Sequence, residues 1–228
     1  MKKAVVERLF ERLTAERPEP KAELNYSTPF ELLVAVILSA QATDKGVNLA
    51  TDRLFPKANT PQAIQKLGEV GLLQEIRTIG LAPTKAKNVI ATCGMLLEKH
   101  GGEVPNSREA LEELPGVGRK TANVVMNVAF GVPTIAVDTH VFRISNRTGL
   151  APGKNVREVE DKLMRVTPKA YLQHAHHHLI LHGRYVCKAR KPECPTCVIV
   201  EECGFKEKTK PEGSPANCTA ANKKRVQA

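Results

Sequence analysis

The sequence predicts an all-α fold, and three observations support this prediction. Small polar residues recur at positions typical of helix N-caps, glycines follow several apolar segments where helices would end, and strand signals are almost absent. At 228 residues the chain can bury a substantial core, as one large domain or two small ones. We expect two lobes.

The first elements indicate neither a secretion signal nor a membrane anchor. Charged residues interrupt the apolar positions of residues 1–13, so no uncharged signal-peptide core is present there. The apolar segment of residues 30–42 is broken by Glu31 and Gln41 and is too short to cross a bilayer. We interpret this segment as a buried helix and expect a cytoplasmic protein that does not bind membranes.

Further helix boundaries follow along the chain. The predicted starts, in order, are Thr28-Pro29, Thr60-Pro61, Thr84, Asn106-x-x-Glu109 and Asn155-x-x-Glu158. The predicted ends are Gly131, Gly149 and Gly183, each of which follows an apolar periodic segment. After Lys206 the chain is polar and basic, and we expect residues 207–228 to be disordered because they offer too little apolar surface to offset ordering entropy.

The charge balance favours a polyanionic partner. Lys and Arg outnumber Asp and Glu by 34 to 24, which gives a net charge of +10. Nucleic acid is the leading candidate and an anionic membrane surface the second. Because the chain has no Trp and only 4% aromatic residues, it has little surface on which unpaired bases could stack, and duplex DNA is favoured.

The most informative segment is Gly116-Val117-Gly118, which lies between two predicted helices. Two glycines in this spacing permit a tight turn, and such a turn can direct backbone N–H groups at a phosphate beside the N-terminus of the next helix. An ordinary helix-turn-helix corner is the alternative. Leu-Pro before the turn and Arg119-Lys120 after it favour phosphate binding.

Lys120 is a candidate nucleophile. It falls in the first turn of the following helix beside Arg119, and both the helix end and the neighbouring cation should lower the pKa of its ammonium. A neutral amine can attack a sugar carbon and form a Schiff base. From this segment alone, a lysine that merely touches phosphate is an equally good interpretation.

Asp138 shifts the balance toward chemistry. It follows the apolar residues 132–137 at a predicted helix start, where its first role would be that of an N-cap. A carboxylate at the edge of a cleft can also stabilise an oxocarbenium-like sugar while a base departs. The two roles can coexist.

Four cysteines form a C-x6-C-x2-C-x5-C pattern that indicates a metal centre. They are Cys187, Cys194, Cys197 and Cys203. Zinc and a cubane iron-sulfur cluster are both candidates, and the spacing alone does not choose between them. The basic loop between the first two cysteines, which includes Lys191, is expected to meet phosphates. Cys93 and Cys218 do not share the spacing, and we interpret both as non-ligands.

The histidine-rich segment of residues 174–182 contains i,i+4 pairs, for which a transition-metal site is conceivable. A partly solvated helix face is the favoured interpretation.

Taken together, the hairpin with Lys120, residues 137–140 and the four-cysteine loop resemble the endonuclease III family, bifunctional DNA glycosylases and AP lyases of the helix-hairpin-helix superfamily. The similarity extends over about residues 1–206 and includes residues 38–44, 78–81 and 179–184. It implies an enzyme that removes oxidised pyrimidines from duplex DNA and cleaves abasic sites by β-elimination.

The resemblance also implies an architecture and a cofactor. A six-helix barrel with the helix-hairpin-helix motif would span residues 22–132, and residues 1–21 with 133–206 would form a second lobe. A [4Fe-4S] cluster would bind the four cysteines. The protein would act as a monomer associated with the nucleoid.

By the same resemblance, Lys120 would be the nucleophile and Asp138 its catalytic partner. Gln41 would fill the hole left by the extruded nucleotide, while Leu81, together with Ile79, would wedge beside the unpaired base. Two residues depart from the family pattern: Ala82 stands where an aromatic residue is frequent, and His178 where Trp is common.

Two rival functions are also compatible with parts of this pattern. A related adenine glycosylase shares the cysteine loop, but that family normally lacks a lysine at the position of Lys120 and carries a C-terminal recognition domain. A noncatalytic iron-sulfur protein that binds DNA or senses redox state would leave Lys120 and Asp138 without a role.

Overall fold

The computed structural model describes residues 1–211, and this part of the chain consists of helices and loops without a strand. The α-helices are α1 (Lys3–Glu16), α2 (Pro29–Leu38), α3 (Asp44–Leu54), α4 (Pro61–Ile76), α5 (Ala82–His100), α6 (Arg108–Glu112), α7 (Arg119–Phe130), α8 (Thr139–Thr148), α9 (Val156–Val166) and α10 (Leu172–Tyr185). Two 3-10 helices, Lys169–Tyr171 and Cys194–Thr196, complete the order. The predicted all-α class is confirmed.

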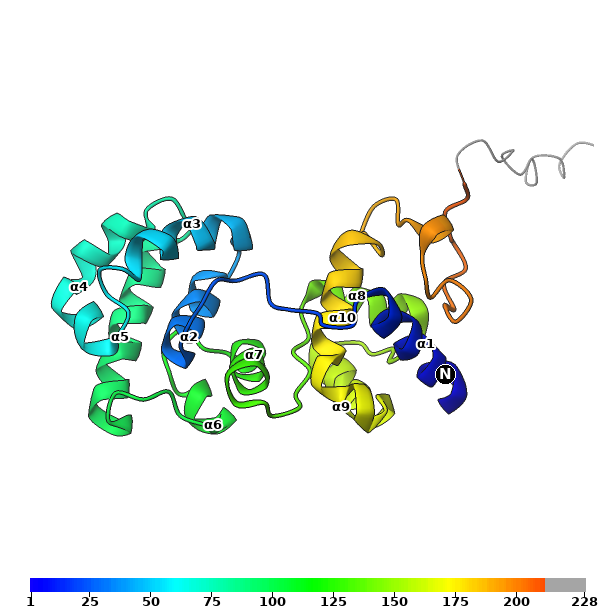
Figure 1. Cartoon of the computed structure of the whole chain (residues 1–228), viewed down its shortest axis with the longest axis horizontal. Coiled ribbons are helices and arrows are strands. Elements are labelled where there is room, and N and C mark those ends of the chain that lie inside the picture. Colours follow the sequence, from blue (N-terminus) through cyan, green and yellow to red (C-terminus); the bar gives the residue numbers. More distant parts are fainter. Residues whose placement is uncertain (212–228) are drawn as a thin grey trace, which may run out of the picture.

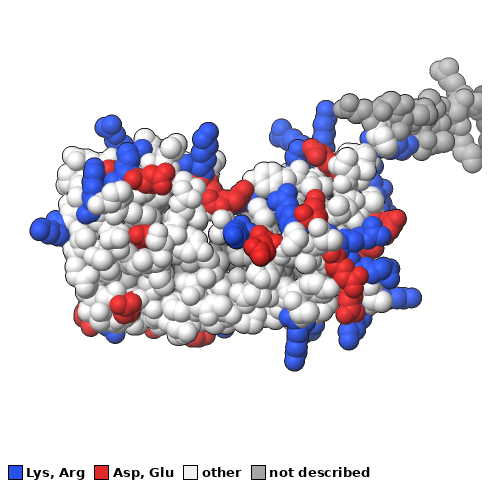
Figure 2. All heavy atoms as spheres, viewed as in Figure 1, with Lys and Arg blue, Asp and Glu red and all other residues white. Residues whose placement is uncertain are grey.

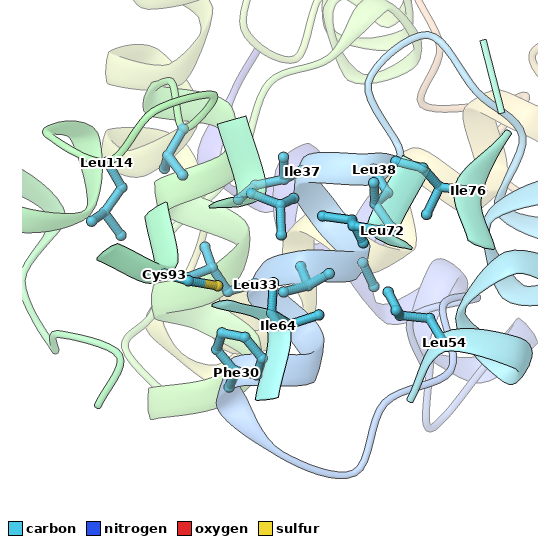
Figure 3. Close-up of a cluster of buried hydrophobic side chains, with 14 of the residues drawn as sticks. Phe30, Leu33, Ile37, Leu38, Leu54, Ile64, Leu72, Ile76, Cys93 and Leu114 are labelled. Carbon is cyan, nitrogen blue, oxygen red and sulfur yellow. The ribbon is translucent and has the colours of Figure 1, made fainter. Parts of the chain in front are cut away.

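The helices pack around two large apolar clusters. The first cluster lies among α2 to α7 and is shown in Figure 3. The second is built from α1, α8, α9 and α10 with Ile199. In Figure 1, α1 lies among α8, α9 and α10, away from α2, the next helix in the chain. A small third cluster, which includes Val36, Val124 and Ala136, lies where α2 and α7 meet the segment before α8.

This arrangement agrees with the expectation of two lobes, whose boundaries near residues 22 and 132 remain a prediction. The predicted tail lies mostly outside the described residues. No helix within residues 1–211 is both long and apolar enough to cross a membrane.

Several predicted caps are found in the structure. Thr28, Thr60 and Asn155 each accept a hydrogen bond from a backbone N–H three residues later, at 2.9 to 3.2 Å. Gly131 and Gly149 end α7 and α8 in the left-handed conformation, with φ of 66° and 78°. These helix boundaries were therefore correctly predicted from local sequence.

Three predicted boundaries were wrong. Ser107, and not Asn106, caps α6, because its hydroxyl accepts the Ala110 N–H. Leu81, and not Thr84, is the N-cap of α5, since Pro83 fits the first helical turn. Gly183 lies inside α10, where a Cβ atom would come within 3.0 Å of the His140 Cβ atom. Gly183 thus permits close packing of α10 against α8 and does not end a helix.

Candidate active site

Lys120 and Asp138 line the same cleft, which has a volume of about 590 Å³. Its walls come from the loop after α2, the N-termini of α7 and α8, and α10. A cleft of this size is typical of ligand sites. The structure therefore brings together the two residues that the sequence predicted as a catalytic pair.

Lys120 is the second residue of α7, as predicted, and its side chain is open to the cleft. Although the amine can meet a substrate, the surrounding protein removes water from it, and this desolvation lowers the pKa of the ammonium. The positive charge of Arg184 lowers the pKa further, whereas the carboxylates of Asp138 and Asp44 oppose the shift. The direction matches the prediction.

The cause of the shift differs from the prediction. Arg119 is not among the charges that perturb Lys120. Its guanidinium instead pairs with Glu160, with Arg119 Nη2 lying 2.8 Å from Glu160 Oε1. The cation that acts on Lys120 is Arg184 of α10, which sequence proximity could not reveal.

Asp138 is the N-cap of α8, as predicted. Its Oδ1 atom accepts hydrogen bonds from the His140 N–H at 2.9 Å and the Val141 N–H at 2.8 Å. These two bonds fix the carboxylate at the positive end of the helix, beside the cleft. The same side chain can therefore hold the helix start and face a positively charged sugar.

The predicted hairpin joins α6 to α7, and its two glycines have different requirements. Gly116 has a φ of 80°, and a Cβ atom there would lie 2.9 Å from Asn88 Nδ2, so the turn itself requires glycine. A Cβ atom on Gly118 would meet no atom of the described residues within 4 Å. Gly118 is the N-cap of α7 and supplies no side-chain cap, which leaves the first N–H groups of the helix for an external acceptor. Val117 between them is buried, so it can offer only its backbone.

Three non-glycine residues in the described part of the chain have a positive φ: Gln41 at 54°, Leu81 at 61° and Lys191 at 48°. All three had been predicted to contact DNA. Such strained positions are enriched at functional sites. Leu81 also leaves 55% of its surface exposed.

Ile79 does not share this exposure. Its side chain is 5% exposed and packs in the first apolar cluster. This burial favours Leu81 over Ile79 as the wedge, and both assignments remain predictions.

Sequence reasoning gave no role to an ion-pair network at the cleft. Arg184 pairs with both Glu23 and Asp44, and Glu23 also accepts a hydrogen bond from the Tyr185 hydroxyl. Asp44 and Arg184 stand at the ends of two segments that resemble the endonuclease III family, but only the fold shows that they meet.

The histidine-rich helix is buried, contrary to the predicted solvated face. His176, His177 and His178 are at most 9% exposed, and only His174 of the segment is open to solvent. Since α10 packs between α1 and α8, burial lowers the pKa of His176 to about 3 and of His177 and His178 to about 4. His176 lines the cleft, and its Nδ1 lies 2.9 Å from the Ala136 carbonyl oxygen.

The four predicted cysteine ligands line one small, apolar cavity. Burial raises the pKa of Cys197 to about 11, so a thiolate there needs nearby positive charge, as a metal centre provides. Within residues 1–211, no three His, Cys, Asp or Glu side chains lie close enough to hold a single metal ion. The structure thus brings the four predicted ligands to one cavity, and the nature of the metal centre remains a prediction.

Two arginines of α8 hold the loop that carries the first cysteine. Arg143 donates to the carbonyl oxygens of Cys187 and Gly183, at 3.0 and 2.7 Å. Arg147 donates to the Lys188 and Ala189 carbonyl oxygens, at 2.6 and 2.9 Å. Cys93, predicted as a non-ligand, lies in the first apolar cluster (Figure 3), and Cys218 lies outside the described residues.

Fold and cleft together define a helix-hairpin-helix protein with a desolvated lysine, the class to which many DNA glycosylases belong. The family model of the HhH-GPD superfamily base excision DNA repair protein matches residues 34–169. Endonuclease III of Haemophilus influenzae is 64% identical over 86% of this chain and 93% of its own length. Endonuclease III of Escherichia coli K12 is 60% identical over 91% of this chain and 99% of its own.

Comparison with solved structures indicates the same family. A trapped covalent intermediate of endonuclease III with DNA superimposes with a TM-score of 0.84 at 47% identity, covering 90% of this chain and 96% of the other. The chain therefore belongs to the endonuclease III family. It is accordingly a base excision repair enzyme with DNA glycosylase and AP lyase activity.

Proposed function

We propose that the enzyme removes oxidised pyrimidines from duplex DNA and then cuts the strand through an imine on Lys120. The observation that carries this proposal is a desolvated lysine in a cleft shared with a fixed carboxylate. The covalent DNA intermediate of the solved relative supports it.

The chemistry begins when the damaged nucleotide is extruded from the stack, since its sugar carbon is otherwise out of reach. The neutral Lys120 amine attacks C1′, and the bond from C1′ to the base breaks with its electron pair leaving on the base. The departing base takes up the proton that the amine loses. The carboxylate of Asp138 stabilises positive charge on the sugar as the base departs.

Strand cleavage follows from the same intermediate. The sugar ring opens to give a protonated imine between C1′ and Lys120 Nζ, which acidifies the C2′ hydrogen. Loss of that proton and rupture of the C3′–O bond release the 3′ phosphate. Water then hydrolyses the imine and restores the free amine.

DNA would be held at several separate points. The N-terminus of α7 with Gly118 offers N–H groups to a phosphate, while Gln41 and Leu81 present exposed side chains in strained backbone. On the face in Figure 2, basic and acidic side chains are interspersed and form no single patch of one sign. We expect binding at these discrete contacts, by a monomer, at the nucleoid.

We further propose that Cys187, Cys194, Cys197 and Cys203 hold a [4Fe-4S] cluster. The cluster, when bound, supplies iron as the acceptor for four thiolates and cross-links a segment with little apolar core of its own. Arg143 and Arg147 keep the loop in place from α8. About four iron atoms per chain, without zinc, is the expected metal content.

Borohydride trapping tests the central proposal. Incubation with duplexes that carry thymine glycol or an abasic site should give a covalent adduct for the wild type and none for Lys120→Ala. An adenine glycosylase would excise adenine from mispairs without nicking the strand. Absence of an adduct with the wild type, or undiminished nicking by Lys120→Ala, would refute the lyase mechanism.

A further inference from the structure

Arg119 directly precedes Lys120, yet its side chain binds a carboxylate on another helix. Arg119 Nε lies 2.9 and 3.1 Å from the two carboxylate oxygens of Glu160, and Arg119 Nη2 lies 2.8 Å from Oε1. The side chains of Arg119 and Glu160 are 27% and 10% exposed. This bidentate geometry is the strong form of an arginine–carboxylate pair.

The pair joins helices that belong to different apolar clusters. Helix α7 contributes Ala122 and Val125 to the first cluster, and α9 contributes Val159 and Leu163 to the second. Between Arg119 and Glu160 the chain runs through α7 and α8, and therefore through Lys120 and Asp138. The ion pair thus closes a loop that contains both catalytic residues.

Two carboxylates already surround the Arg119 guanidinium. Nε and Nη2 are bound to Glu160, and Nη1 lies 3.6 Å from Glu112 Oε1. Two carboxylates beside the guanidinium also neutralise the charge that a phosphate would need. A DNA contact, as the sequence had predicted for this residue, is therefore disfavoured.

We propose that Arg119 is a positioning residue that fixes the start of α7 against α9 and so sets the placement of Lys120 relative to Asp138. This inference rests on the proposed function of Lys120. Because a misplacement of about 1 Å can cost roughly a hundredfold in rate, a contact that fixes the residue next to the nucleophile can strongly affect the reaction rate.

Neutral variants on either side of the pair test the proposal. Arg119→Gln and Glu160→Gln should each slow single-turnover borohydride trapping on saturating abasic DNA by about tenfold or more. The double variant should be no slower than the slower single variant, because both changes remove the same interaction. Glu112→Gln is the matched control: it also faces Arg119 but lies on α6 of the same hairpin, and should change the rate by less than about twofold.

Further measurements separate positioning from other roles. Because the Asp138 carboxylate raises the pKa of Lys120, a changed placement of Lys120 relative to Asp138 should move the pH midpoint of trapping in the same direction in both single variants. The salt slope of DNA affinity should be unchanged. A slope reduced by about one in Arg119→Gln, with Glu160→Gln at wild-type rate, would overturn the proposal in favour of a phosphate contact.

A purely structural role would be seen differently. It would lower the trapped amplitude by reducing the folded fraction, and leave the rate constant of the remaining enzyme unchanged; this result would also overturn the proposal. Failure of the proposed function itself would appear instead in wild type that does not trap, or in Lys120→Ala that does.

Discussion

The backbone of Gln41 stores strain that can be separated from the function of its side chain. A left-handed conformation costs a non-glycine residue about 1–2 kcal/mol, and glycine introduces an opposing entropic cost of about 0.5–1 kcal/mol. The side chain is exposed, so its removal sacrifices little buried surface. Gln41→Gly should therefore raise the free energy of unfolding by about 0.5–1 kcal/mol, or Tm by about 1–4 °C for a chain of this size.

Gln41→Ala is the matched variant, because it removes the same side chain but keeps the strain. Both variants should excise thymine glycol from duplex DNA on the order of tenfold more slowly in single-turnover assays, which corresponds to about 1.4 kcal/mol. Thermal melting monitored by circular dichroism gives the stability. If Gln41→Gly melts no higher than Gln41→Ala, the assignment of strain is wrong; if both excise at the wild-type rate, the proposed role of the side chain is wrong.

Three further predictions follow from the site. Asp138→Asn keeps a capping side chain and should move the alkaline-rising limb of trapping to lower pH, because the Asp138 carboxylate raises the pKa of Lys120; Asp138→Ala should in addition lose about 1 kcal/mol of stability with the cap. An unmoved limb in a folded Asp138→Asn would contradict the electrostatic account. Gly116→Ala should strongly lower the free energy of unfolding, whereas Gly118→Ala should lower it by at most about 1 kcal/mol. Gly118→Ala should nevertheless weaken DNA binding in a filter assay. Equal losses of stability in the two variants would argue against this distinction. The buried histidines stay neutral in the folded state, whereas those of the unfolded chain become protonated below about pH 6.5, so the free energy of unfolding should fall toward acid pH by up to about 1.4 kcal/mol per pH unit for each histidine, down to about pH 4. His178→Phe should make this fall shallower when stability is measured by urea titration at a series of pH values. An unchanged slope would exclude His178 from the effect.

Local chemistry made much of the fold predictable. The caps at Thr28, Thr60 and Asn155 act on N–H groups three residues away, so the sequence contains all the partners. The same holds for the left-handed helix ends at Gly131 and Gly149. These elements are set by interactions within one helical turn.

Predictions failed where a distant part of the chain decides the outcome. Gly183 looks like a helix end, but close packing against His140 explains it. Ile79 and Leu81 are two residues apart, yet Ile79 is buried in the core and Leu81 is exposed. Arg119 was interpreted from its neighbour Lys120, whereas its partner Glu160 lies 41 positions away. Sequence spacing identifies a lysine and a carboxylate as candidates, but only the fold identifies the charges around them.

The identity of the amine that becomes covalently bound to the sugar decides whether the proposed mechanism holds. The most direct test is peptide mass spectrometry of the wild-type enzyme reduced with borohydride on abasic duplex DNA. The sugar remnant is expected on Lys120. Attachment to the N-terminal amine or to another lysine, with Lys120 unmodified, would contradict the mechanism.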